Sequence, residues 1–227
     1  MLKLDHQQLL NYIETSRVLH GTTERPGLML TPTNEIVKFF YRRKKISTAT
    51  FLPQAKRFTA NSRKLLARDI PAPVVKDIMY CKEVPVHMVV YDRIEGKDVR
   101  ELCQSDGVAN LARMPAHFAH LHKTGIFFRA VHLGNILVNA DKISLVDISD
   151  LSTQGSSLGV FQRARNLAHL FNAEPDKAYF ITYGPHKFVQ EYLAACQFPT
   201  ICTWLFLKRL HFALDDDMLR ALLNQQE

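Results

Sequence analysis

The sequence has few cysteines and no long apolar run, and both absences limit what the chain is. The four cysteines are Cys81, Cys103, Cys196 and Cys202. They form no C-x-x-C pair and no metal-finger spacing, which is typical of reduced packing residues in a cytoplasm. The longest apolar stretch near the C-terminus, residues 198–207, is about half the ~20 residues that a membrane span needs. The first residues mix charged and apolar side chains, unlike a secretory signal. We therefore expect a cytoplasmic chain without a transmembrane segment.

The sequence also lacks repeats, low-complexity tracts and Gly/Ser linkers, so any division must come from the order of its elements. Its 227 residues suffice for one domain or for two small lobes. The apolar content of 47% and the charged content of 22% are those of an ordinary globular protein. The net charge of +7 favours acidic partners such as phosphates, anionic lipids or nucleic acid, or serves only solubility.

The first part of the chain is rich in short apolar runs separated by Gly, Pro and Asn, which predict β-strands. After a short opening helix, we expect five strands, at 17–21, 27–32 and 35–43 and within 71–83 and 86–96. Between the third and fourth strands, Phe51, Ala55, Phe58, Ser62 and Leu65 recur at helical spacing. One basic helix therefore interrupts the sheet.

From Lys97 onward helical patterns dominate, at 97–104, 108–123, 160–171, 186–197 and 214–226. Residues 135–148 contain two short apolar runs joined by the turn-forming "NADK", which predicts a hairpin. The expected fold class is α+β in two lobes. Residues 1–96 form a five-stranded antiparallel lobe with one helix, and residues 97–227 form a mainly helical lobe.

Two polar residues mark the ends of the predicted hairpin. Asn135 and Asp147 are 12 positions apart, so the fold-back brings both side chains to one edge. A carboxylate and an amide oxygen, with water and phosphate oxygens completing the shell, suit Mg²⁺. Asn and Asp near turns are more often caps, and that interpretation stays open.

A single lysine lies inside the apolar strand "IVKFF". A lysine at such a position, Lys38, can act as a point charge for nucleotide phosphates, or it is an ordinary lysine on an exposed face. The order of elements favours the first interpretation. Lysine on the third strand, a helix, two strands, helices, Arg129, Asn135, a hairpin and Asp147 follow one another as in the protein-kinase signature.

The stretches "LHKTGIFFRAVHLGNILV" and "ISLVDI" carry a resemblance to a known family. The chain resembles small bacterial members of the protein-kinase-like superfamily, of the lipopolysaccharide-core heptose and Kdo kinase type, with the kindred toluene-tolerance-protein group. In those kinases the loop reads like "HRDLHxGNIL", which residues 131–135 match closely. The resemblance spans roughly residues 17–171 and implies a bilobal protein-kinase-like fold.

The resemblance also implies site residues and cofactors. Lys38 would contact the α- and β-phosphates of ATP, Asn135 and Asp147 would hold Mg²⁺, and Arg129 belongs to the catalytic loop. The segment 91–96 would form the hinge behind the adenine. Its proposed cofactor-binding residues are Tyr91, Asp92 and Ile94. His122 would be a buried structural histidine.

The chain departs from the family pattern at four places. Ala130 replaces the aspartate that acts as general base, and "DIS" replaces "DFG" at Asp147. The turn at 20–27 has only two glycines and does not fit G-x-G-x-x-G. No acidic residue lies between Ser47 and Arg68, so the helix lacks the glutamate that orients the lysine. We expect the nearest polar neighbour of Lys38 to be Asn61, Gln54 or Asp147 instead.

Loss of the general base need not abolish transfer. A base typically contributes ~10²–10⁴-fold, whereas positioning and electrostatics contribute most of phosphoryl-transfer catalysis. His132, two residues beyond Ala130, and Asp150, three residues beyond Asp147, are each a candidate replacement base. His132 also occurs where the aspartate is present, and Asp150 is alternatively a helix cap.

Three functions follow from these observations. The first is an ATP- and Mg²⁺-dependent phosphotransferase acting on a sugar hydroxyl of an envelope glycolipid. The second is a pseudokinase, a nucleotide- or partner-binding module without catalysis, and the third and most distant is a basic nucleic-acid-binding protein. A basic cluster on the first lobe suggests an anionic glycolipid partner at the inner membrane surface. It comprises residues 41–45, Lys56, Arg57, Arg63, Lys64 and Arg68.

Overall fold

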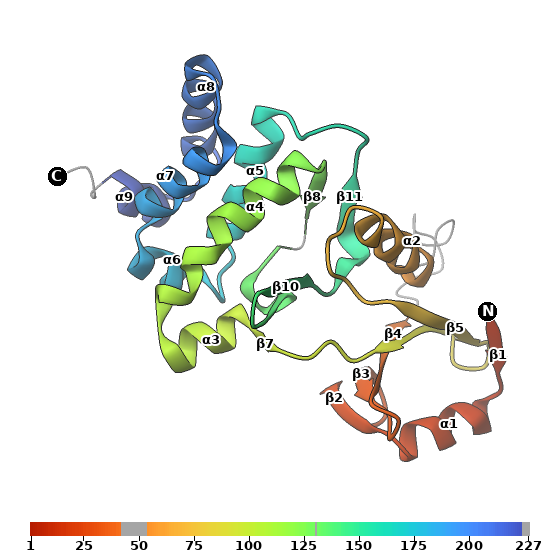
Figure 1. Cartoon of the computed structure of the whole chain (residues 1–227). Coiled ribbons are helices and arrows are strands. Elements are labelled where there is room, and N and C mark those ends of the chain that lie inside the picture. Colours follow the sequence, from red (N-terminus) through yellow and green to blue (C-terminus); the bar gives the residue numbers. More distant parts are fainter. Residues whose placement is uncertain (42–53, 130, 224–227) are drawn as a thin grey trace. The chain divides into compact units, whose positions relative to one another are not determined.

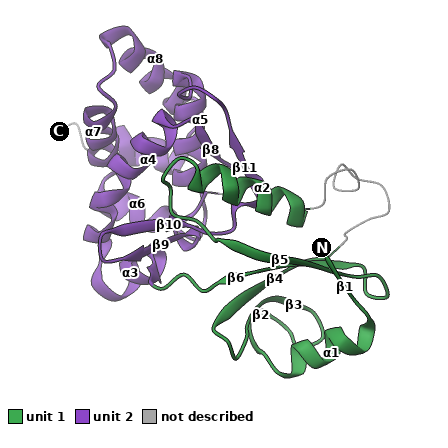
Figure 2. Cartoon of the chain, turned by 45° about the vertical axis from the view of Figure 1, so that its right-hand side comes forward, with its two compact units in different colours: residues 1–95 green, residues 96–227 purple. Residues whose placement is uncertain are grey.

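A computed structural model gives the structure of the chain and describes residues 1–41, 54–129 and 131–223. The chain divides into two compact units, Met1–Glu95 and Gly96–Glu227 (Figure 2). The division falls at the end of the segment 91–96. The predicted positions 42–53, which include most of "YRRKK" and the start of the basic helix, lie outside the described residues, as does Ala130.

The first unit is built on a six-stranded sheet. Its strands are β1 (Leu2–Leu4), β2 (Arg17–Gly21), β3 (Pro26–Leu30), β4 (Glu35–Tyr41), β5 (Val75–Cys81) and β6 (Val86–Asp92). Their order across the sheet is β1-β5-β6-β4-β3-β2. All neighbours are antiparallel except β1, which pairs in parallel with β5 through Leu2 and Met79.

The prediction of a five-stranded, purely antiparallel lobe is therefore wrong by one edge strand. The additional strand β1 forms because the helix α1 (His6–Glu14) begins only at His6 and not at the first residues of the chain. Asp5 accepts from the N–H of Gln8 at 2.8 Å, and the Gln8 side chain accepts from the N–H of Asp5 at 3.0 Å. This capping box leaves the preceding residues extended and able to pair with β5.

The two faces of the sheet carry different partners. On one face Val37 and Phe39 join the core beneath Leu9 and Ile13 of α1. Strand alternation puts Ile36, Lys38 and Phe40 on the other face. There Phe40 packs against Phe58 of the helix α2 (Gln54–Leu66), with ring centroids 6.0 Å apart. The half-buried Lys38 therefore lies on the face that α2 covers.

The second unit is mainly helical (Figure 1). Its α-helices are α3 (Val99–Asp106), α4 (Met114–Lys123), α5 (Val160–Phe171), α6 (Lys177–Tyr183), α7 (Pro185–Cys196), α8 (Thr200–His211) and α9 (Asp216–Leu223). Its short strands are β7 (Lys97–Asp98), β8 (Ile126–Phe128), β9 (Ile136–Asn139), β10 (Lys142–Leu145) and β11 (Leu151–Thr153). Aromatic residues of three helices form its centre, where the ring of Phe171 packs edge-on against Phe180 and Phe188.

Two predicted helices begin later than their apolar patterns suggest. The helix predicted at 97–104 begins at Val99, because Asp98 caps it by accepting from the N–H of Glu101 at 2.9 Å. The pattern at 108–123 is divided into a 3₁₀ turn at Val108–Arg113 and α4, whose first turn contains Pro115. The helix α5 has the predicted bounds 160–171.

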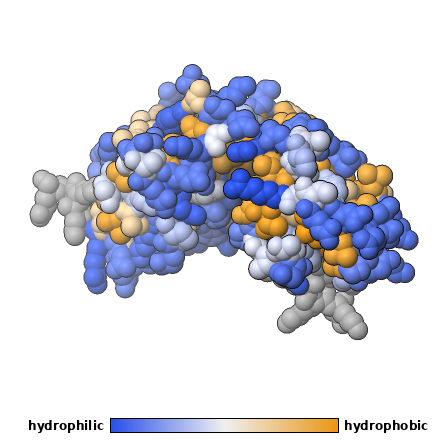
Figure 3. Space-filling view, turned by 90° about the horizontal axis from the view of Figure 1, so that it is seen from below, coloured by the Kyte–Doolittle hydropathy of each residue, from blue (hydrophilic) through white to orange (hydrophobic). Residues whose placement is uncertain are grey.

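The surface is mixed in character. The face shown in Figure 3 is largely hydrophilic, with smaller hydrophobic patches between the polar side chains. No helix among the residues that the structure describes has the length and apolar content to cross a membrane.

Candidate active site

The predicted hairpin at 135–148 is confirmed. Strands β9 and β10 are antiparallel, and their last pair is Ile136 with Leu145. Beyond it the N–H of Val146 donates to the carbonyl of Asn135 at 2.9 Å. Asn135 and Asp147 therefore lie at the same end of the hairpin.

The backbone of Asp147 is unusual. It has φ 51° and ψ 48°, the left-handed conformation, which costs most non-glycine residues free energy and is concentrated at turns and functional sites. Asp147 is half-buried, and Asn135 is almost fully buried at the end of a 3₁₀ turn, Leu133–Asn135. The hairpin end thus presents one carboxylate and one amide in a partly enclosed place.

These two side chains fit a Mg²⁺ ion better than a metal held wholly by protein. Within the described parts of the chain, no group of three or more His, Cys, Asp or Glu side chains gathers to hold a metal. Mg²⁺ is commonly bound by one or two protein oxygens, with water and substrate phosphates as its other ligands. The donor set therefore suits a metal–phosphate complex.

An ion pair between the fully buried Asp176 and the half-buried Arg100 fixes the turn that precedes Asn135. The fully buried Asp176 carboxylate accepts from Arg100 Nε at 2.5 Å through Oδ1 and from the N–H of Leu133 at 2.6 Å through Oδ2. The guanidinium also lies against Gly134, where an added Cβ would be only 3.0 Å from Arg100 Nη1. Arg100 and Asp176 therefore hold residues 132–134 from the side of the helices, and we call this pair the loop clamp.

The loop clamp also restricts His132. Arg100 Nη2 donates to His132 Nδ1 at 3.2 Å, because a guanidinium has no acceptor. A neutral His132 therefore carries its proton on Nε2. Burial, and secondly the charge of Arg100, lower the pKa of His132. With Nδ1 engaged and Nε2 protonated, the neutral ring has no free lone pair to accept a proton, and Nε2–H can only donate a hydrogen bond.

The backbone of Asp150 lies next to Arg129, the residue before position 130. Strand β8 pairs with β11 through Phe128 and Leu151, and the N–H of Arg129 donates to the carbonyl of Asp150 at 3.3 Å. Asp150 thus pairs with the residue directly before position 130. Arg129 is exposed and Asp150 is half-buried.

A second polar network anchors Phe128, at the start of this loop. Asn166 accepts from the N–H of Phe128 at 3.1 Å and donates to its carbonyl at 2.7 Å. His122 Nε2 donates to the same Asn166 oxygen at 3.2 Å, and Tyr192 donates to His122 Nδ1 at 2.7 Å. His122 is fully buried, as the sequence predicts for a structural histidine.

Sequence reasoning identified neither the loop clamp nor Asn166 and Tyr192. Asp176 lies 43 positions after Leu133, whose N–H donates to it. Nothing in the sequence around Asp176 distinguishes it from a residue that caps a helix. A carboxylate at a helix start is common. Only the tertiary structure identifies its partners.

The predicted nucleotide-binding residues of the first unit have other contacts. Tyr91 is buried, and its ring stacks on Phe58 at 5.6 Å. Asp92 forms an ion pair with Lys76 at 2.6 Å, and Lys76 also contacts Glu35 at 2.8 Å. Ile94 follows the last β6 pair, Asp92 with Glu35. Asn61 is buried on α2, and Gln54 is half-buried at its start.

Comparisons with known proteins give partial structural similarity alone. No family model matches the chain, and a comparison with curated proteins finds no match. A solved structure of WbdD, described as a bifunctional kinase-methyltransferase, is 16% identical over 88% of this chain and 45% of that chain, with a TM-score of 0.49. Another, of WbdD with a kinase inhibitor, is 17% identical over 88% and 46%, with a TM-score of 0.45. This chain spans less than half the length of those WbdD chains.

Replacing Asp176 tests the loop clamp. We expect Asp176→Asn to lower the free energy of unfolding by about 3–5 kcal/mol, because one oxygen cannot accept from both Arg100 and Leu133 and the guanidinium loses its counter-charge. Calorimetry should show a melting temperature lower by roughly 10 °C. The control is Asp217→Asn, since Asp217 is an exposed partner of Lys177 at 3.0 Å and should contribute at most about 1 kcal/mol. Equal effects of the two variants would contradict the clamp.

The buried histidine predicts a pH dependence. Burial lowers the pKa of His122 from 6.5 to about 3 in the folded chain. The unfolded chain therefore binds a proton that the folded chain does not, and stability should fall as the pH decreases below 6.5, by about 1.4 kcal/mol per unit for this group. His122→Gln should show a shallower decrease in urea titrations between pH 7 and 5 than the parent chain, and an unchanged decrease would contradict the prediction.

Proposed function

We propose that the chain is a phosphotransferase of the protein-kinase type that uses ATP and Mg²⁺. The end of the hairpin carries this proposal: Asn135 and Asp147 lie together there, and Asp147 has a left-handed backbone. Asn135 and Asp147 would hold the Mg²⁺ ion, which would supply neutralising charge to the nucleotide phosphates.

The nucleotide-binding residues of the first unit are assigned from their surroundings. Lys38 lies half-buried on the α2 face of the sheet, with Nζ 5.9 Å from the centre of the Phe40 ring. A lysine on such an apolar face suits contact with the α- and β-phosphates. Because the Tyr91 ring and the Asp92 carboxylate already have partners, adenine recognition falls to the chain around Ile94.

Asp150 is the proposed general base. Its backbone pairs with Arg129, directly before the alanine that replaces the usual aspartate. In the transfer, Asp150 accepts the proton of the acceptor hydroxyl, whose oxygen bonds to the γ-phosphorus as the bond to the ADP oxygen breaks. The acceptor is a sugar hydroxyl of an envelope glycolipid. His132, with Nδ1 engaged by Arg100, orients the loop.

One observation favours a second function, that of a pseudokinase. Ala130 cannot accept a proton, and His132 is arranged as a donor. If Asp150 does not reach the acceptor, the chain binds a nucleotide without transferring phosphate.

Nucleotide binding is testable by thermal shift. ATP with Mg²⁺ at about 100-fold its dissociation constant should stabilise the chain by ~2.7 kcal/mol, or several degrees in melting temperature. Asp147→Asn should remove most of this shift, because the metal loses its charged ligand. Asp150→Asn should retain it. The absence of any shift in the parent chain at millimolar ATP and Mg²⁺ would refute the proposal.

Turnover separates the kinase from the pseudokinase. Asp150→Asn should lower phosphate transfer, or the hydrolysis of ATP, by roughly 10²–10⁴-fold without changing nucleotide binding, because it removes the proton acceptor. Ala130→Asp should restore activity in the Asp150→Asn background. If the parent chain, both variants and Asp147→Asn share one background rate in a radiolabelled-phosphate assay, the chain is a pseudokinase.

A further inference from the structure

The helix α8 exposes large apolar side chains, unlike an ordinary surface helix. Its inward residues, Phe206 and Leu210, are fully buried. On its outer side Ile201 is 62% exposed and Trp204 is 54% exposed, and Phe212, directly after the helix, is 77% exposed. The helix is therefore apolar on two sides, and only one of them is covered within the described structure.

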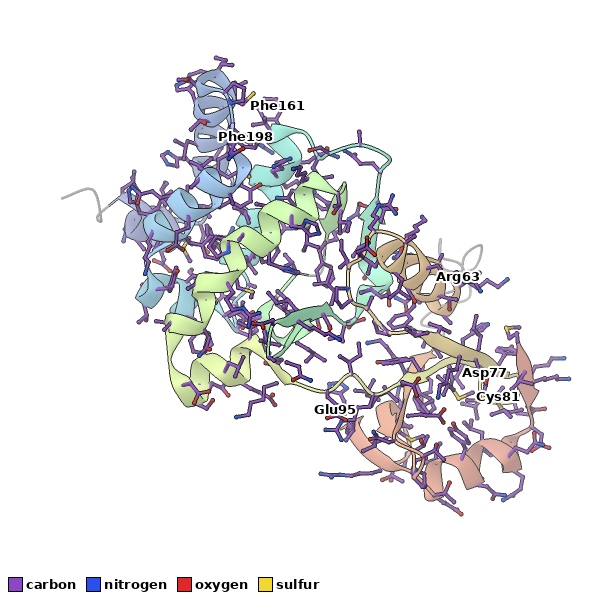
Figure 4. All side chains as sticks on the ribbon, in the orientation of Figure 1. Arg63, Asp77, Cys81, Glu95, Phe161 and Phe198 are labelled. Carbon is purple, nitrogen blue, oxygen red and sulfur yellow. The ribbon has the colours of Figure 1, made fainter. Side chains whose placement is uncertain are left out.

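The exposed residues form one continuous line. Ile201, Trp204, Lys208 and Phe212 are spaced by three or four residues, and Phe212 still has helical backbone angles, so all four lie on the same side of the helix. We call these four residues the α8 stripe. In Figures 1 and 2 α8 lies at one end of the second unit, where it packs against α5. Figure 4 labels Phe198, just before α8, and Phe161 of α5 in the same region.

The charge on α8 itself has one sign. The sequence has no Asp or Glu between Glu191 and Asp215, whereas Lys208 and Arg209 are exposed. Lys208 Nζ lies 5.0 Å from the centre of the Trp204 ring, a cation–π contact. The acidic residues that follow are partly neutralised, because Lys177 pairs with Asp215 at 2.9 Å and with Asp217 at 3.0 Å.

We propose that the α8 stripe docks on the surface of an anionic lipid bilayer. Tryptophan and lysine favour the boundary between head groups and acyl chains, where the apolar ring enters and the ammonium remains at the phosphates. At ~1.5 Å per residue, the helix is about 18 Å long, too short to span a bilayer, so it would lie in the plane of the interface. A flat anionic lipid surface complements both the exposed apolar side chains and the positive charge of the stripe.

A second copy of the chain is a poorer occupant. A symmetric contact through the stripe would bring Lys208 and Arg209 of both copies together, with no carboxylate on that side of either helix. The proposed surface also differs from the basic cluster of α2, which lies in the first unit. The inference does not rest on nucleotide binding or on catalysis.

The sequence contains a built-in reporter, because Trp204 is its single tryptophan. The full chain is mixed with phosphatidylcholine vesicles, with and without phosphatidylglycerol. We expect Trp204 emission to shift to shorter wavelength, and to be quenched by brominated acyl chains, only with the anionic vesicles. The change should weaken as salt is raised, because the basic residues contribute by electrostatic attraction.

Variants assign the binding to the stripe. Ile201→Ser with Phe212→Ser should lower the partition coefficient at least tenfold in vesicle sedimentation, and Lys208→Glu should remove the preference for anionic lipid. Leu19→Ser is the matched control, since Leu19 is a 43% exposed apolar residue of the first unit, and it should bind like the parent chain. Lys56→Glu with Lys64→Glu changes the α2 cluster and should have a smaller effect than Lys208→Glu.

Three outcomes would overturn the proposal. One is unchanged Trp204 emission with anionic vesicles. Another is equal sedimentation of the parent chain and the Ile201→Ser, Phe212→Ser variant. The third is a concentration-dependent dimer, seen by analytical ultracentrifugation, that this variant abolishes while vesicles bind neither protein. The melting temperature of the same variant, measured without nucleotide, checks its folding and is independent of lipid binding.

Discussion

The candidate site depends on one buried carboxylate. Asp176 has no exposed surface, yet it holds both the Arg100 guanidinium and the backbone of Leu133. A buried charge is costly unless it is paired and fully hydrogen-bonded. The Asp176 carboxylate therefore fixes the positions of its hydrogen-bond donors, Arg100 and Leu133. The turn ending at Asn135 takes its position from the loop clamp, and Gly134 leaves room for the guanidinium. The metal-binding chemistry proposed for the hairpin therefore depends on a residue of another element.

Phe128, two residues before position 130, is likewise held by hydrogen bonds to a buried polar side chain. Asn166 satisfies both backbone groups of Phe128, and His122 and Tyr192 complete its hydrogen bonds. Because each polar group has a partner, the network is compatible with an otherwise apolar centre. Two polar networks, one before and one after position 130, thus hold the backbones of Phe128 and Leu133.

The contacts of His132 and Asp150 bear on which of them could act as the proposed base. His132 is close to position 130 in the sequence, but its Nδ1 faces a guanidinium, and the pKa of the ring is lowered. Asp150 is more distant in sequence, and strand pairing brings its backbone beside Arg129. Spatial neighbours are therefore better candidates than sequence neighbours for replacing a lost group. The roles of both residues stay predictions until turnover is measured.

The sequence by itself determined the features that depend on local signals. The turn "NADK" between apolar runs specified the hairpin, and helical periodicity specified α5 with its bounds. Alternation in β4 placed Lys38 on the same face as Phe40. Only the tertiary structure decided the sixth strand, the partners of Asp176 and the exposure of α8. The physical reason is the same in each case: pairing of a strand edge, burial of a charge and coverage of a helix face depend on residues that are distant in sequence.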